Sequence, residues 1–131
     1  MIKEVVAEGP GGRVIVMDSI TMVTPADAGA IVVSGSHGGA SSGSYALEVP
    51  LEAAFFNDAG IGKDDAGVVA LEMLQAVGVA AATVSHTSAR IGDARDCWES
   101  GVVSRCNEIA RALGLEPGAN LRAGLSRLLL R

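Results

Sequence analysis

The chain has 131 residues, a formal net charge of −5 and a composition that is 49% hydrophobic but only 3% aromatic. Its length suits one compact domain, residues 1–131, whose core is built from aliphatic and alanine side chains. The ten Lys and Arg residues are scattered singly, and without a basic run to follow a phosphate backbone we expect no nucleic-acid partner.

The apolar segments do not have the pattern of a membrane protein. The N-terminus alternates charged with apolar residues, whereas a signal peptide needs an uninterrupted apolar stretch. The longest apolar region, 67–84, contains Glu72 and is interrupted at Gly78, which is typical of a helix followed by a strand. We therefore expect a cytoplasmic protein with no membrane partner. Cys97 and Cys106 are too few for a disulfide framework and are consistent with reduced thiols.

The first half of the chain predicts two strands and a helix. A glycine-rich turn at 9–12 precedes a short β-branched strand at 13–17. A second apolar strand follows at 30–34. A short helix over 41–47 ends before Pro50, because the residue that precedes a proline avoids the α region.

The second half predicts two more strands, each followed by a helix. Residues 53–57 form an apolar run without alternation, which indicates a central strand buried on both faces. A helix over 68–77 is followed by a fourth strand at 81–85. A long helix is predicted over about 94–113, with a bend at 100–101. Its apolar stripe consists of Val102, Cys106, Ile109 and Leu113.

The C-terminal segment, 120–131, has the pattern of an amphipathic helix. Leu121, Leu125, Leu128 and Leu129 fall on one face. On a domain this small, such a stripe either packs on a neighbouring subunit or covers its own sheet. The first alternative leads us to expect a homo-oligomer.

The alternation of strands and helices predicts a single three-layer α/β domain. Its sheet should be mostly parallel, with about four to five strands and right-handed crossovers. The order of the strands is not readable from the sequence. A Rossmann-like or flavodoxin-like order and a swivelling β/β/α arrangement, with the N-terminal strands in a separate layer, both stay open.

Three predicted strands each end in a short polar, glycine-rich loop: 35–39, 58–62 and 86–90. If these strands are parallel neighbours, the loops open on one rim, where open α/β sheets bind ligands. His37 and His86, the only histidines, lie in two of these loops, and we expect one or both to be catalytic. The alternative is that they are structural.

The first loop favours anion binding, because its glycines allow a ligand to approach the backbone N–H groups. The ligand-binding candidates are Gly35, Ser36, Gly38, Gly39 and Ser41. The sequence around Ser41 also matches the G-x-S-x-G pattern of serine hydrolases. A nucleophile elbow lies directly at a strand-to-helix turn, however, and Ser41 is distant from the predicted strand end at Ser34. A flexible turn is the remaining alternative.

The second loop lacks both nucleotide fingerprints. It has neither the first glycine nor the Ser or Thr after Lys63 that a Walker A loop requires, and G-x-G-x-x-G is absent. We therefore expect no cofactor. Asp58 can act as a base or orient a histidine, or it can simply cap a turn. Asn57, Gly60 and Lys63 are ligand-binding candidates.

The third loop carries the densest polar cluster. Arg90 offers a bidentate fork for a carboxylate or phosphate, and Ser85 and Ser88 add hydroxyl groups. Asp93 and Asp96 can instead neutralise the arginines or cap a helix; we expect Asp93 to be a cap and Arg95 to be solvated. No HxH, HxxxH or CxxC spacing is present, so we expect no metal site.

These features together predict a small cofactor-independent enzyme that uses acid/base chemistry on an anionic metabolite. Isomerase, lyase and hydrolase reactions all fit such a site. The alternative is a non-catalytic metabolite-binding or regulatory domain, or a subunit of a larger complex. In either case the expected ligand is a small carboxylate or phosphate.

Overall fold

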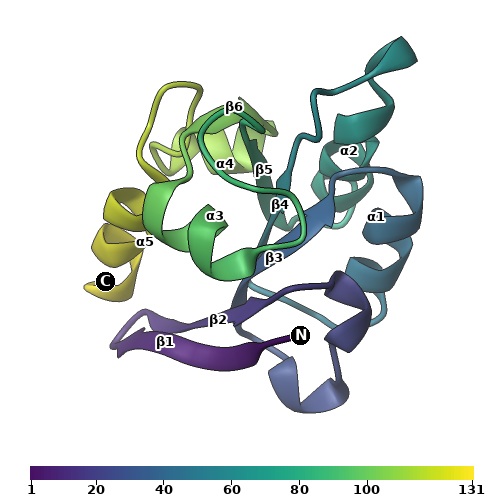
Figure 1. Cartoon of the computed structure of the whole chain (residues 1–131). Helices are drawn as coiled ribbons and strands as arrows, with labels where there is room; N and C mark the ends of the chain where they lie inside the picture. The colour runs from purple at the N-terminus through teal and green to yellow at the C-terminus, as the bar shows by residue number, and fades with distance from the viewer.

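A computed structural model describes all 131 residues as an α/β domain in which one six-stranded mixed sheet carries helices on both faces (Figure 1). The strands are β1 Lys3–Gly9, β2 Gly12–Met17, β3 Ile31–His37, β4 Ala53–Asn57, β5 Ala80–Val84 and β6 Val103–Cys106. The α-helices are α1 Ala40–Leu47, α2 Val69–Gln75, α3 Ala94–Ser100, α4 Glu108–Ala112 and α5 Leu121–Leu129. Three 3₁₀ turns complete the chain: η1 Ile20–Met22, η2 Pro25–Asp27 and η3 Lys63–Val68.

The six strands lie in chain order across the sheet. The pairs from β2 to β5 are parallel, whereas β1 and β6 pair antiparallel at the two edges. The predicted mostly parallel sheet is therefore a mixed one. Its order differs from both doubly wound orders, in which the strand order reverses inside the sheet. A separate N-terminal layer is also absent, because β1 and β2 belong to the same sheet.

Both faces of the sheet are buried, and successive strand residues alternate between them. Val14 and Val16 of β2 belong to one hydrophobic cluster, while Ile15 belongs to the other. In β4, Phe55 and Phe56 are each 1% exposed and lie in opposite clusters. The prediction of a strand buried on both faces at 53–57 is confirmed.

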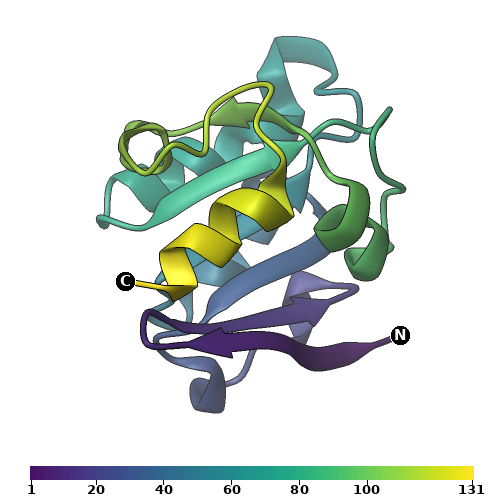
Figure 2. The same ribbon diagram turned by 90° about the vertical axis from the view of Figure 1, so that its left-hand side faces the viewer.

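The helices divide between the two faces according to the strand order. Ala46 of α1 and Leu74 of α2 pack in the same cluster, because strands that advance in one direction through right-handed crossovers keep their helices on one side. After β5 the chain passes to the other face, where Trp98 of α3 and Leu125 of α5 are buried. Figure 2 shows α5 lying obliquely across this second face.

The helix predicted over 94–113 is wrong. The first part, α3, ends at Gly101, whose backbone is extended, and β6 follows. The β-branched Val103 then pairs with Val84 of β5. A new helix, α4, begins after Asn107, whose side chain accepts a hydrogen bond from the Ala110 amide. Non-local pairing with β5 thus prevails over the apolar stripe, and Cys106 is a half-buried residue of an edge strand.

The C-terminal leucines cover the chain's own sheet. Leu121, Leu125, Leu128 and Leu129 are all buried in the cluster beneath α3 and α5. Of the two alternatives for this helix, packing on a neighbouring subunit or on its own sheet, the structure shows the second. The leucine stripe therefore does not provide an association surface. None of the helices combines the length and apolar character needed to cross a membrane.

Candidate functional site

The three glycine-rich loops open on the same edge of the sheet. β3, β4 and β5 are parallel neighbours, so their carboxyl ends meet at one edge, which we call the rim. The prediction that the loops share a rim is confirmed. β3 is longer than expected and runs to His37, which pairs with Asn57 of β4 after a shift in register beyond Val33.

Asp58 and His86 form the closest polar pair on the rim. Asp58 follows β4 directly, and its backbone amide donates to the Val84 carbonyl at 2.8 Å. Its Oδ1 accepts hydrogen bonds from the Gly60 amide at 2.8 Å and from the His86 amide at 3.1 Å. The same oxygen lies 3.2 Å from Nδ1 of His86. The Asp58 side chain is 4% exposed, whereas the His86 side chain is 55% exposed.

The surroundings of Asp58 keep it ionised. Burial by itself would raise its pKa, but the hydrogen bonds from the Gly60 amide, the Ser104 hydroxyl and His86 outweigh burial and lower the pKa below its ordinary value of 3.8. An ionised carboxylate only accepts hydrogen bonds, so Nδ1 of His86 carries the hydrogen that Asp58 accepts. The neutral imidazole is left with its Nε2 lone pair, the atom a base uses.

The loop after Asp58 is strained. Four residues other than glycine have a positive φ: Ala59 (51°), Ile61 (69°), Asp64 (56°) and Asp65 (57°). Side chains in this left-handed region cost about 1–2 kcal/mol per residue. Gly60, at φ 83°, lies against the His86 ring, which is 3.8 Å from the position of a Cβ there. Strain of this kind persists where the surrounding structure holds it, and functional sites are a common place for it.

Asn57 holds two of the loops together from inside. Its side chain is fully buried; Nδ2 donates to the Ala89 carbonyl at 2.9 Å and Oδ1 accepts from the Ala59 amide at 2.9 Å. The polar atoms predicted to bind a ligand are therefore occupied by the protein. Lys63 lies in the exposed part of the same loop and forms no ion pair.

The third loop forms an open depression beside His86. Its volume is about 320 Å³, and its lining includes Thr87, Ser88, Arg90 and Asp96. The Arg90 side chain is 81% exposed, and its guanidinium lies 3.7 Å from Asp96. Ser85 is more enclosed, because its hydroxyl accepts from the Ser88 amide at 3.2 Å. Ser88 donates in turn to the Ser85 carbonyl at 2.8 Å.

The structure also shows what Asp93 and Arg95 contact. Asp93 caps α3, as predicted, by accepting from the Asp96 amide at 3.0 Å. Arg95 is exposed, as expected, and it also forms surface ion pairs with Glu4 and Glu99. These contacts leave Arg90 as the exposed guanidinium of the depression.

The first loop is arranged differently. Nδ1 of His37 accepts a hydrogen bond from the Gly39 amide at 3.0 Å, and the two imidazoles share no hydrogen bond. Ser36 is occupied, because its hydroxyl accepts from the Ile20 amide at 2.9 Å. Gly35 lies directly under the backbone of Gly92, whose amide donates to the Gly35 carbonyl at 2.7 Å.

Gly38 and Ser41 complete the first loop. Gly38 packs against the Gly67 carbonyl, at a distance that leaves no room for a side chain. Because β3 extends to His37, Ser41 lies in the first turn of α1, much nearer to the strand end than the sequence indicated. Its hydroxyl nevertheless forms no hydrogen bond with His37 or His86, so no serine and base are paired.

Two residues of the site were not predicted. The hydroxyl groups of Thr83 and Ser104 lie 2.9 Å apart, and Ser104 helps to lower the pKa of Asp58. An irregularity in the β5–β6 register positions Ser104, as bulges often do beside functional sites. The signal that was available was the β-branched pair Val102–Val103 after Gly101, which favours a strand.

The cysteines and acidic residues do not form a further centre on the rim. Cys97 is buried next to Asn57, and burial raises the pKa of its thiol to about 11, so it packs instead of reacting. No three side chains of His, Cys, Asp or Glu converge in the way that a metal ion requires. No family model, curated protein or solved structure is detectably similar to this chain.

Proposed function

We propose that the chain is a small cofactor-independent enzyme in which His86, oriented by Asp58, moves a proton on an anionic metabolite. The observation that carries this proposal is the hydrogen bond from Nδ1 to a buried, ionised carboxylate, which leaves Nε2 free on a half-exposed ring. That arrangement fixes the tautomer of a base and stabilises the imidazolium formed when Nε2 accepts a proton.

The depression beside His86 supports an anionic substrate. Arg90 has only one long ion pair, at 3.7 Å, and a highly exposed side chain, so it can exchange Asp96 for a carboxylate or phosphate. The Thr87 hydroxyl lines the same depression. With the anion on Arg90, Nε2 of His86 would face the neighbouring carbon or oxygen of the substrate. Proton transfer there serves an isomerase, a lyase or a hydrolase.

The first test of this proposal is ligand binding. A panel of carboxylated and phosphorylated metabolites is screened by thermal unfolding, since a ligand at 100 times its Kd adds about 2.7 kcal/mol of stability. We expect one compound class to stabilise the wild type and not Arg90→Ala. Arg111→Ala is the matched control, because Arg111 is also an exposed arginine with a single ion pair, to Glu116 at 3.5 Å.

The second test separates an enzyme from a binding domain. With the ligand in hand, turnover is followed by NMR for the wild type, His86→Gln and His37→Gln. An enzyme of the proposed kind loses turnover in His86→Gln while its affinity for the ligand is kept, and His37→Gln stays active. Absence of turnover in the wild type, with only an affinity change in His86→Gln, would instead support a non-catalytic metabolite-binding domain.

A further inference from the structure

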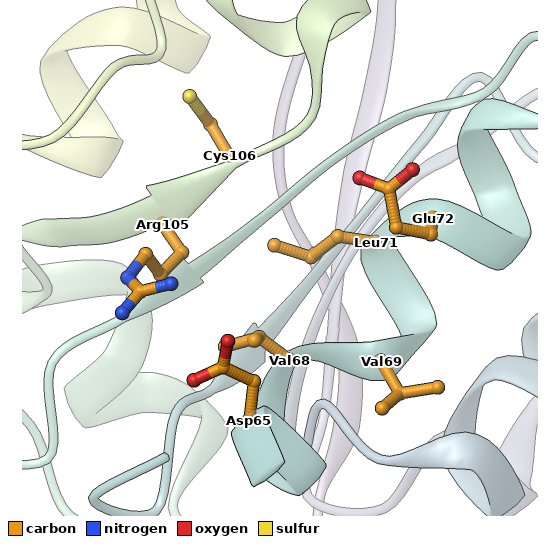
Figure 3. A pocket seen from close by; sticks show the side chains of 7 residues that line it. All are labelled: Asp65, Val68, Val69, Leu71, Glu72, Arg105 and Cys106. Carbon is orange, nitrogen blue, oxygen red and sulfur yellow. The ribbon is translucent and has the colours of Figure 1, made fainter.

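A second cavity lies between α2 and β6, and none of its lining residues belongs to the depression beside His86. Its volume is about 290 Å³, at the lower end of the range for small-molecule sites. Figure 3 shows the side chains that enclose it. They include Asp65, Val68, Val69, Leu71, Glu72 and Arg105.

The cavity combines both signs of charge, and the protein does not neutralise them. Arg105 projects from β6, and Asp65 and Glu72 come from η3 and α2 on the opposite side (Figure 3). None of these three groups takes part in an ion pair, whereas four other arginines of the chain do. The charges at the cavity are therefore available to a ligand.

The floor of the cavity is apolar. Leu71 is 4% exposed, and in Figure 3 its side chain extends from α2 toward β6. Val68 lies next to it in the lining. The partly buried Val68 and the 38% exposed Val69 still present apolar surface to water, and an aliphatic group of a ligand that covers them gains the free energy of removing it.

This distribution of charge selects the ligand. A simple anion on Arg105 would be repelled by the two carboxylates, and a simple cation near Asp65 would be repelled by the guanidinium. A molecule that carries one ammonium and one carboxylate group satisfies both sides. We propose that the cavity binds a free α-amino acid with an aliphatic side chain. Its carboxylate meets Arg105, its ammonium meets Asp65, and its side chain covers Val68 and Val69.

The test uses L-leucine and two analogues that each lack one charge. L-Leucinamide has no carboxylate, and 4-methylpentanoate has no ammonium group. Calorimetric titration should show leucine binding and about tenfold weaker binding of each analogue. Arg105→Gln and Asp65→Asn should each weaken leucine binding by a similar factor, and Arg111→Gln should leave it unchanged. His86→Gln should also bind leucine normally, which separates this inference from the proposed function.

If no aliphatic amino acid binds at millimolar concentration, or if leucinamide binds as well as leucine, the proposal is wrong.

Discussion

The two histidines of the rim, His37 and His86, differ in the hydrogen-bond partner of Nδ1. His86 faces a buried carboxylate that accepts the Nδ1 hydrogen, so the lone pair of the neutral ring is on Nε2 of a half-exposed side chain. His37 accepts a backbone hydrogen bond on Nδ1, so the hydrogen of the neutral ring is on its Nε2. Position at the end of a parallel strand is therefore not enough to make a histidine catalytic. The partner of its other nitrogen determines what the ring can do.

The largest effect should come from removing the charge that orients His86. Asp58→Asn should lower turnover about 10³- to 10⁴-fold, because the imidazole loses its tautomer preference and the imidazolium its counter-charge. His37→Gln should change turnover by less than about threefold. Nitrogen-15 NMR checks the cause without a substrate: His86 should be the Nδ1–H tautomer and His37 the Nε2–H tautomer. Equal losses in the two variants would contradict the assignment.

The hydrogen bonds of Asn57 should contribute more to the stability of the fold than that of Ser36. Asn57→Ala should lower the free energy of unfolding by about 2–3 kcal/mol, since it leaves the buried Ala89 carbonyl and the partly buried Ala59 amide without their partner. Ser36→Ala removes one partly buried hydrogen bond, to the Ile20 amide, and should cost about 1 kcal/mol. Urea unfolding measures the free energy of unfolding of both variants. A loss for Ser36→Ala as large as that for Asn57→Ala would contradict the role of Asn57 as the main internal support of the rim.

The strain beside Asp58 should be measurable by relieving it. Ala59→Gly should raise the free energy of unfolding by about 0.5–1 kcal/mol, because glycine adopts a positive φ without steric cost. Ala40→Gly, the matched change in the first turn of α1, should lower the free energy of unfolding by up to about 1 kcal/mol. Destabilisation of similar size in both variants would mean that Ala59 is not strained.

The smallest effect should appear in the dependence of the free energy of unfolding on pH, at acidic pH. Because the folded-state pKa of Asp58 is lowered, its carboxylate stabilises the fold above the ordinary pKa of 3.8. This contribution is lost as the pH falls through the lower, folded-state pKa. Between about pH 5 and pH 2, the wild type should therefore lose stability more steeply than Asp58→Asn, and His37→Gln should follow the wild type. Parallel curves for wild type and Asp58→Asn would contradict the pKa shift.

The local patterns of the sequence located most of the sheet. The strands at 13–17, 30–34, 53–57 and 81–85 were predicted from apolar runs bounded by glycine and polar residues, and all four are present as β2 to β5. The edge strands were not predicted. β1 combines three charged residues with a short apolar stretch and none of its residues is fully buried, and β6 was hidden in an apparent helical stripe.

Part of the candidate site was equally predictable. Asp58 and His86 were named because each follows a strand, and parallel pairing brings strand ends to one rim. Their contact, the strained loop at Ala59 and the support from Ser104 were not foreseeable. Each depends on which strands are neighbours and on a bulge in β6, and no short stretch of sequence contains that information.

The sequence by itself determined where the strands of the parallel part lie, apart from the extension of β3 to His37, and that polar loops follow them. Hydrophobic runs and turn residues act over a few positions, so they are visible locally. Tertiary structure decided the strand order, the edge strand made from Val103, and which histidine meets Asp58. Those outcomes rest on contacts between residues far apart in the chain, such as Asp58 and His86, where packing on both faces of the sheet prevails over local preference.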